Sequence, residues 1–264
     1  MSGPKVVILC GGLGSRLREE TEFKPKPLVE IGGRPILWHI MKEYAHFGFR
    51  EFVLCLGYRG HMIKEYFLGY EYMHNDFLLD LGTNERRALR PNHGGEDWRI
   101  IFADTGLETN TGGRIKRIQQ YIDTDYFFAT YGDGVSDVDI RALEAFFLTK
   151  GKVAVITGLH PWSKYGRVDV GADEIVKGFA EKPQLKDVIN GGFFVFSRRI
   201  FDYLEGNSVL EREPFERLAK DQEMVLFKHD GFWHAMDTYK DYLELNRMWS
   251  SGAAPWRVWD REGA

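Results

Sequence analysis

Short apolar runs alternate with helix-like patterns through most of the chain. Lys5-Val-Val-Ile-Leu-Cys10 is an apolar run rich in β-branched residues and followed by glycine, which is typical of a buried strand. Residues 35–48 place proline in the first turn and glycine at the end of an amphipathic helix. Residues 51–57 then predict a strand and residues 61–68 a helix. This order predicts parallel βαβ units, with ligands bound at the carboxyl ends of the strands.

The same alternation continues to the end of the chain. Residues 166–171 and 175–179 alternate like an antiparallel pair, so we expect the sheet to be mixed at this end. Residues 237–264 form a helical tail in which Trp256 and Trp259 suggest docking onto the body or a neighbouring subunit. Further strand-like runs lie at residues 99–104, 125–131, 153–159 and 190–196.

Residues 69–98 interrupt this regular pattern. They mix a short strand-like piece with polar and glycine-rich turns, and they are too many for a bare connection in a compact domain. We expect an excursion with its own hairpin or helix, attached to a single α/β domain that spans residues 1–264. His74 and His93 lie here without a partner at metal-ligand spacing, so we expect them at a surface or interface. His39 and His46 fall on the first helical pattern, where packing or solvation is favoured over metal binding.

Composition narrows the class of protein. A chain of 264 residues can bury one substantial core. The formal net charge of −4 argues against a general binder of nucleic acid or of an anionic membrane. Cys10 and Cys55 lie in apolar runs, which favours buried thiols over a disulfide or a metal site. Since no signal peptide or spanning segment is visible, we expect a cytoplasmic protein.

The glycine-rich stretch after the first strand carries the strongest chemical signal. Gly11-Gly12-Leu13-Gly14-Ser15-Arg16 removes side chains where the backbone must turn sharply or approach a ligand. Arg16, Lys24 and Lys26 supply cations, and each lysine stands before a proline. Backbone N–H groups add fixed positive potential. The stretch therefore predicts a site for a polyphosphate.

Three motifs compete for this stretch. A Walker P-loop needs a Gly-Lys-Ser/Thr ending, which is absent here. A dinucleotide fingerprint, as in nicotinamide-dependent oxidoreductases, fits Gly12 and Gly14, but Leu17 stands where a third small residue is needed. The pattern G-G-x-G-[ST]-R-L followed by K-P-K-P is complete, and it resembles the signature of sugar-phosphate nucleotidylyltransferases. A tight βα turn with solvated cations is the purely structural alternative.

Two polar turns downstream add candidate ligands. Thr109 to Arg114 ends in a Thr-Gly-Gly-Arg turn, which we interpret as a helix N-cap that also closes over a nucleotide. Asp133 lies between two glycines after the run 125–131, so we expect it at the carboxyl end of a central strand. There a carboxylate could hold Mg²⁺ together with substrate phosphates. A turn-forming aspartate is the alternative.

The C-terminal half contributes candidates for an acceptor and for the metal. Glu181 can accept hydrogen bonds from sugar hydroxyls, Lys182 can neutralise a phosphate, and Asn190 can both donate and accept. A solvated Glu-Lys pair is the alternative for the first two. Asp237 precedes the terminal helix and is a candidate second carboxylate for a metal held by Asp133.

Motifs along nearly the whole chain, from residue 5 to the Pro255-Trp256 tail, point to one family. They include GGLGSRL, KPKPLVEIGG, ILWHIM, TGGRIKR, YGDGVSD, EKP, NGGFFVF and GFWHAMDT. The chain resembles the glucose-1-phosphate cytidylyltransferases among the sugar-phosphate nucleotidylyltransferases. The resemblance implies a Rossmann-like α/β core with a mixed, mostly parallel sheet, and a homo-oligomer that is often a hexamer.

The resemblance also implies a role for each site residue. Arg16, Lys26 and Asp133 would be catalytic, with Asp133 and Asp237 as Mg²⁺ ligands. Glu181, Lys182, Asn190 and Gly191 would bind the sugar phosphate. The nucleotide would be bound by Leu9, Gly11, Gly12, Leu13, Gly14, Ser15, Arg16, Lys26, Thr109, Arg114 and Asp133.

The implied reaction transfers a cytidylyl group from CTP to a sugar 1-phosphate, foremost glucose 1-phosphate, and releases pyrophosphate. Residues 160–169 depart from the family's usual sequence near the acceptor pocket. The resemblance therefore indicates the acceptor less strongly than the nucleotide. Three alternatives stay open: another acceptor, another nucleoside triphosphate, or a non-catalytic nucleotide-sugar sensor. Retention of Lys26, Asp133 and Asp237 argues against the last.

Overall fold

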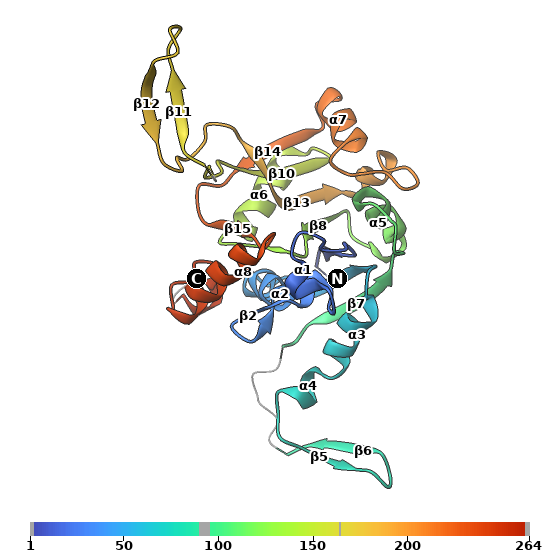
Figure 1. The fold of residues 1–264 in the computed structure, drawn as a ribbon. Helices are drawn as coiled ribbons and strands as arrows, with labels where there is room; N and C mark the ends of the chain where they lie inside the picture. The colour runs from blue at the N-terminus through green and yellow to red at the C-terminus, as the bar shows by residue number, and fades with distance from the viewer. Residues whose placement is uncertain (1–2, 90–95, 164, 262–264) are drawn as a thin grey trace.

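The fold is built on a seven-stranded sheet with the order β14-β10-β13-β8-β1-β4-β7 (Figure 1). The computed structural model describes residues 3–89, 96–163 and 165–261. The strands of this sheet are β1 (Val6–Cys10), β4 (Glu51–Leu56), β7 (Arg99–Asp104), β8 (Tyr126–Tyr131), β10 (Ala154–Leu159), β13 (Ile189–Ser197) and β14 (Met224–Lys228).

The sheet is mostly parallel, as the sequence predicts. β1 pairs in parallel with β4 and β8, β4 with β7, and β10 with β14, whereas β13 runs antiparallel to β8 and β10. The prediction of a mixed sheet is confirmed, but its stated reason is wrong. The predicted antiparallel pair forms β11 (Arg167–Val170) and β12 (Val176–Ala180), a separate hairpin. Both its faces are largely exposed, so it has no buried face with which to join the sheet.

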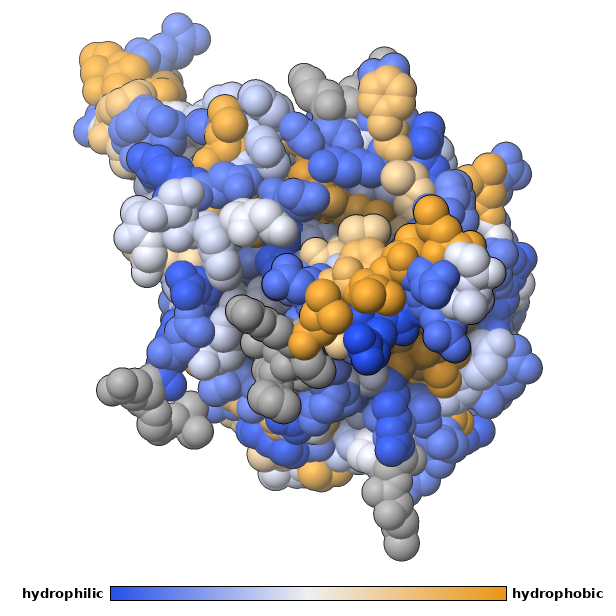
Figure 2. All heavy atoms as spheres, turned by 90° about the horizontal axis from the view of Figure 1, so that it is seen from below, coloured by the Kyte–Doolittle hydropathy of each residue, from blue (hydrophilic) through white to orange (hydrophobic). Residues whose placement is uncertain are grey.

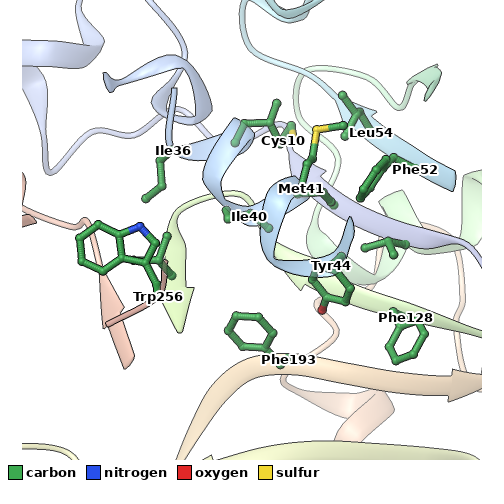
Figure 3. Packing of buried hydrophobic residues seen from close by; sticks show 14 of the residues in the cluster. Cys10, Ile36, Ile40, Met41, Tyr44, Phe52, Leu54, Phe128, Phe193 and Trp256 are labelled. Atoms are coloured by element: carbon green, nitrogen blue, oxygen red, sulfur yellow. The ribbon is translucent and has the colours of Figure 1, made fainter. Parts of the chain in front are cut away.

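Alternation along β1 divides the core between the two faces of the sheet. Val6, Ile8 and Cys10 face a cluster that includes side chains of α2, α3, α6 and the C-terminal segment, whereas Val7 and Leu9 face α5 and α7. Figure 3 shows α2 laid on the first face, with Met41 and Tyr44 among the side chains of the strands. Because both faces are covered, β1 is apolar throughout, as is typical of a central parallel strand.

The two helices predicted before residue 70 form, and their ends differ from the predicted ones by at most two residues, whereas α6 and α7 were not predicted. The two predicted helices before residue 70 are α2 and α3. The α-helices are α1 (Arg18–Thr21), α2 (Ile36–His46), α3 (Gly60–Leu68), α4 (Tyr70–Met73), α5 (Thr111–Arg117), α6 (Ile140–Lys150), α7 (Glu213–Lys220) and α8 (Tyr239–Ser250). Short 3₁₀ turns cover Lys26–Leu28, Gln119–Tyr121, Arg198–Asp202 and Val258–Asp260, and small strand pairs join β2 (Glu30–Ile31) to β3 (Arg34–Pro35) and β9 (Gly134–Ser136) to β15 (Trp233–Ala235).

The excursion at residues 69–98 contains both a short helix and a hairpin, the two elements expected from the sequence. After α4, β5 (Phe77–Asp80) and β6 (Glu85–Ala88) form a hairpin that projects from the body (Figure 1). Figure 2 views this end of the molecule and shows apolar side chains gathered on its surface. Phe77, Leu78 and Leu79 are between 38% and 45% exposed, so the hairpin carries an apolar surface that the body does not cover.

The C-terminal tail docks onto the body, as its tryptophans predict. Trp256 is fully buried, and its indole N–H donates to His39 Nδ1 at 3.3 Å. His39 Nε2 lies 2.9 Å from the carbonyl of Ile31, so the ring is neutral with its proton on Nε2. Burial lowers the pKa of His39 to about 4. This histidine therefore packs the tail against α2, and metal binding is ruled out for it.

The two cysteines are buried free thiols, as the sequence predicts. Burial raises the pKa of both Cys10 and Cys55. In the excursion, His74 hydrogen-bonds the carbonyl of Tyr70, and His93 lies outside the described residues. Among the described helices, none is both long and apolar enough to cross a bilayer.

Candidate active site

A cavity of about 400 Å³ opens at the carboxyl ends of β1 and β8. It is lined by the residues predicted to bind the nucleotide, with the exception of Leu13, whose side chain is 60% exposed. The predicted residues that line it are Leu9, Gly11, Gly12, Gly14, Ser15, Arg16, Lys26, Thr109, Arg114 and Asp133.

Parallel pairing brings the two loops of the site together. Leu9 in β1 is in register with Tyr131 in β8, and the N–H of Gly132 donates to the carbonyl of Leu9 at 3.1 Å. The glycine loop and the Gly132-Asp133 turn therefore leave the sheet side by side. Gly14 has a φ of +64°, which favours glycine, and its carbonyl accepts from the N–H of Leu17 at 3.0 Å. These contacts close the loop into a turn over the cavity.

Lys26 contacts both carboxylates that are predicted to bind the metal. Its ammonium donates to Asp133 Oδ2 at 2.7 Å and to Asp237 Oδ1 at 2.9 Å. The Arg16 guanidinium also pairs with Asp237, at 3.1 Å. Burial lowers the pKa of Lys26, but the charges and hydrogen bonds of Asp133 and Asp237 outweigh it, so the pKa is raised above its ordinary value. Lys26 is thus a fixed cation at the edge of the cavity.

A small antiparallel ladder explains how Asp237 reaches Asp133. β9 follows directly after Asp133, and β15 pairs with it so that Ala235 lies opposite Gly134. The N–H of Met236 then donates to the carbonyl of Asp133 at 2.8 Å, which places Asp237 next to it. Beyond it, Thr238 and Asp241 form a capping box that starts α8.

The donor set at Lys26 suits a hard divalent cation. The two carboxylates converge on one cation and remain about a quarter to a third exposed, so solvent and substrate oxygens can reach them. In the described part of the chain no group of three or more His, Cys, Asp or Glu side chains could hold a metal. Two carboxylates completed by waters and phosphates are the usual arrangement for Mg²⁺. Asp133 and Asp237 therefore fit such an ion.

Arg114 is buried and braces the glycine loop from below. Its guanidinium donates to the carbonyls of Leu56, Gly106, Leu107 and Gly11, and to the hydroxyl of Thr105, at 2.8–3.2 Å. Burial lowers its pKa. α5 begins after Asn110, as expected, but the Asn110 side chain makes no cap hydrogen bond to the helix. The main hydrogen bonds of Arg114 go to backbone carbonyls. The glycine loop and the 105–107 turn are therefore held by one side chain.

Gly11 and Gly12 offer a matched test of this brace. A Cβ on Gly11 would lie 2.1 Å from Arg114 Cζ, whereas a Cβ on Gly12 would meet nothing within 4 Å. We expect Gly11→Ala to lower the free energy of unfolding by about 1–3 kcal/mol, because Arg114 must shift from its carbonyls. Gly12→Ala should unfold at the wild-type denaturant midpoint. Equal midpoints for Gly11→Ala and wild type would contradict the bracing role.

The predicted acceptor residues are only partly brought to the cavity. Asn190 lies beside it, with its amide 3.4 Å from the Tyr131 hydroxyl, and the carbonyl of Gly191 accepts from the Trp233 indole at 2.6 Å. Glu181 and Lys182 pair with each other at 3.2 Å, and both side chains are more than half exposed. They do not line the cavity, and they form the solvated Glu-Lys pair given above as the alternative.

Sequence reasoning missed one part of the cavity lining. Tyr131, Val209 and Glu211 line the cavity there. Glu211 accepts from the hydroxyls of Tyr131 and Thr111, which tie the segment before α7 to the start of α5. The polar run Glu205-Gly-Asn-Ser208 marks a loop, but no periodicity points from it to residues 100 positions earlier in the chain.

Comparison with known proteins identifies the family. The nucleotidyl transferase family model matches residues 5–251. The chain is 48% identical over 97% of its length to a probable glucose-1-phosphate cytidylyltransferase of Bacillus subtilis (strain 168), all of which is covered. It is 44% identical over 97% of its length to the glucose-1-phosphate cytidylyltransferase of Salmonella typhimurium (strain LT2), again covered in full.

A solved structure supports the fold. HddC from Yersinia pseudotuberculosis complexed with GMP-PN superposes with a TM-score of 0.68 at 23% identity, covering 94% of this chain and 100% of that one. At that identity the likeness concerns the fold alone, and the family follows from the sequence matches. The chain belongs to the nucleotidyl transferase family and, within it, to the glucose-1-phosphate cytidylyltransferases.

Proposed function

We propose that this protein transfers a cytidylyl group from CTP to a sugar 1-phosphate, foremost α-D-glucose 1-phosphate, to give CDP-glucose and pyrophosphate. The observation that carries the proposal is the Lys26 ammonium, fixed by Asp133 and Asp237 at the edge of a cavity under a glycine loop. A fixed cation and the backbone N–H groups of such a loop suit phosphates, and the rest of the cavity has room for a nucleoside.

The metal in this proposal is Mg²⁺, held by Asp133 and Asp237. When bound, it would neutralise charge on phosphate oxygens that these two carboxylates alone would repel. Lys26 already contacts both carboxylates, so its ammonium is within reach of any phosphate that approaches them.

The protein's side chains then need only to position the two substrates and neutralise the charge on their phosphates. The acceptor phosphate is an anion and can attack the α-phosphorus of CTP in line, so no protein nucleophile is required. Lys26 would hold the α-phosphate or the acceptor phosphate. Arg16, whose side chain is 74% exposed, can leave Asp237 to hold the departing pyrophosphate. Asn190 and Gly191 lie on the side of Tyr131 where an acceptor sugar could bind, and Glu181 and Lys182 remain candidates for the same substrate.

A pyrophosphate-release assay tests the proposal. CTP, UTP, dTTP, ATP and GTP are each combined with glucose 1-phosphate, mannose 1-phosphate, galactose 1-phosphate and a non-sugar phosphate, with Mg²⁺ present and absent. We expect turnover with CTP and glucose 1-phosphate to exceed every other pair by at least tenfold and to require the metal. If another pair of nucleotide and acceptor is preferred, that pair replaces CTP and glucose 1-phosphate in the proposal. If no pair is turned over, the result favours a nucleotide-sugar sensor.

We also propose a homo-oligomer acting in the cytoplasm. The hairpins β5–β6 and β11–β12 project from the body, and two-stranded hairpins are marginally stable alone in water. Val170, Val176 and Phe179 on the second hairpin are 58–67% exposed, which is typical of an interface between subunits. Sedimentation velocity should give a mass several times 30.6 kDa. A monomer at micromolar concentration would contradict the proposal.

A further inference from the structure

Glu211 is a fixed carboxylate on the rim of a cavity suited to polyanions. Its Oε2 accepts from the Thr111 hydroxyl at 2.7 Å, and its Oε1 accepts from the Tyr131 hydroxyl. Glu211 is exposed on its outer side, but it lines the cavity together with both partners. A negative charge placed there repels phosphate groups, so the part of a nucleotide that meets it must be a hydrogen-bond donor.

The two hydroxyl groups are oriented so that both point at Glu211. The N–H of Leu210 donates to the Thr111 oxygen at 2.9 Å, which leaves the single hydroxyl proton free for the carboxylate. The Asn190 amide donates to the Tyr131 oxygen at 3.4 Å, which likewise leaves the Tyr131 hydroxyl proton for Glu211. Each carboxylate oxygen thus has one lone pair used and one free.

The position of Glu211 along the cavity selects the part of the nucleotide. Lys26 and Asp133 mark the phosphate end, and the buried Gly11, Thr109 and Arg114 mark the deep end, where a flat base fits. Tyr131 stands two residues before Asp133 in the chain, and Glu211 is bound to it. Its other partner, Thr111, belongs to the segment of Thr109 and Arg114 and lines the same cavity. Because Glu211 is bound to both segments, we place the ribose, which joins the base to the phosphates, at this carboxylate.

We propose that Glu211 accepts hydrogen bonds from the ribose hydroxyls of the nucleoside triphosphate and makes this enzyme selective for ribonucleotides over deoxyribonucleotides. A carboxylate with two free acceptor sites matches a vicinal diol, and an acidic side chain on a ribose hydroxyl is a recurrent solution in nucleotide sites. Tyr131 and Thr111 act as positioning residues, because they hold the carboxylate without needing to touch the ribose. This inference rests on the proposed function.

The test compares sugar analogues of one nucleotide. The ratio kcat/KM for CTP over 2′-deoxy-CTP and over 3′-deoxy-CTP is measured for the wild type, Glu211→Ala and Glu211→Gln with saturating acceptor. We expect at least one ratio to be about 10- to 100-fold in the wild type, which is typical of a hydrogen bond to a charged acceptor, and to fall to about 1 in Glu211→Ala. The ratio of CTP over UTP should not change, because the base does not meet this carboxylate.

A matched control removes the same charge nearby. Glu213 is exposed two residues away and does not line the cavity, so Glu213→Gln should keep all wild-type ratios. Melting temperatures of the Glu211 variants show whether the loop is intact. Tyr131→Phe leaves Glu211 less restrained and should lower the same sugar ratio without changing the CTP-over-UTP ratio.

The outcomes separate this inference from the proposed function. The inference would be overturned if Glu211→Ala left the kcat/KM ratios of CTP over both deoxy analogues unchanged. It would also be overturned if this variant lowered the CTP-over-UTP ratio, or if it changed only the KM of the acceptor. Displacement of a fluorescent CTP analogue by CTP and by the two deoxy analogues needs no turnover. If the wild type binds CTP but transfers it to no acceptor, the proposed function fails, while this binding series still decides the role of Glu211.

Discussion

Replacing Lys26 by methionine is expected to lower kcat by about 10²–10³-fold, the effect of removing one fixed positive group from a site of charge development. Methionine keeps most of the apolar volume of a side chain that is only 9% exposed, so the fold should survive. What is lost is the ammonium that contacts both Asp133 and Asp237 and faces the phosphates. Steady-state pyrophosphate release with CTP and glucose 1-phosphate measures the effect.

Lys24→Met provides the control for this change. Lys24 lies two residues away on the same Lys-Pro-Lys-Pro segment, but its partner is Glu20 at 3.6 Å and it does not line the cavity. We expect wild-type turnover for this variant. If Lys26→Met retained full kcat, or if both variants lost it equally, Lys26 would have no direct part in the reaction.

Local patterns were enough to predict most strands of the sheet and the glycine loop. β1, β4, β7 and β8 are apolar runs that each lie between clear turns, so their existence follows from the sequence alone, whereas β14 and the order of the strands in the sheet were not predicted. The glycine loop is also recognisable, because Gly14 has a positive φ and Gly11 has no room for a Cβ beside Arg114. The pairing of Asp133 with Asp237 came from family resemblance, and the β9–β15 ladder supplies its physical reason.

Long-range contacts account for what the sequence did not reveal. Arg114 is basic and follows a helix start, which suggested a ligand contact. Its actual partners are carbonyls 7 to 103 positions away along the chain. Glu211 is an ordinary charged residue in a loop, and only the fold sets it against Thr111 and Tyr131. The β11–β12 pair was found by its alternation, but alternation cannot say whether a hairpin joins the main sheet or projects from it.

Asp133→Asn is expected to have the second large effect, lowering kcat by about 10²–10³-fold and weakening the binding of a divalent cation by more than about tenfold. Asparagine keeps the shape of the side chain and one acceptor oxygen, and Asp237 still pairs with Lys26 at 2.9 Å, so the site should remain assembled. What changes is charge. One carboxylate cannot balance both an ammonium and a divalent cation, and the carbonyl oxygen of an amide is a weaker ligand for Mg²⁺.

Two measurements distinguish this effect from a general loss of structure. Titration with Mn²⁺, followed by its electron paramagnetic resonance signal, reports cation binding without turnover, and raising Mg²⁺ should restore part of kcat if weak binding is the cause. Asp125→Asn is the control, because Asp125 is exposed just before the other end of β8, away from the cavity. It should leave both cation affinity and kcat unchanged. If Asp133→Asn kept wild-type cation affinity while losing turnover, Asp133 would act by holding Lys26 in place, and the metal would have to be held elsewhere.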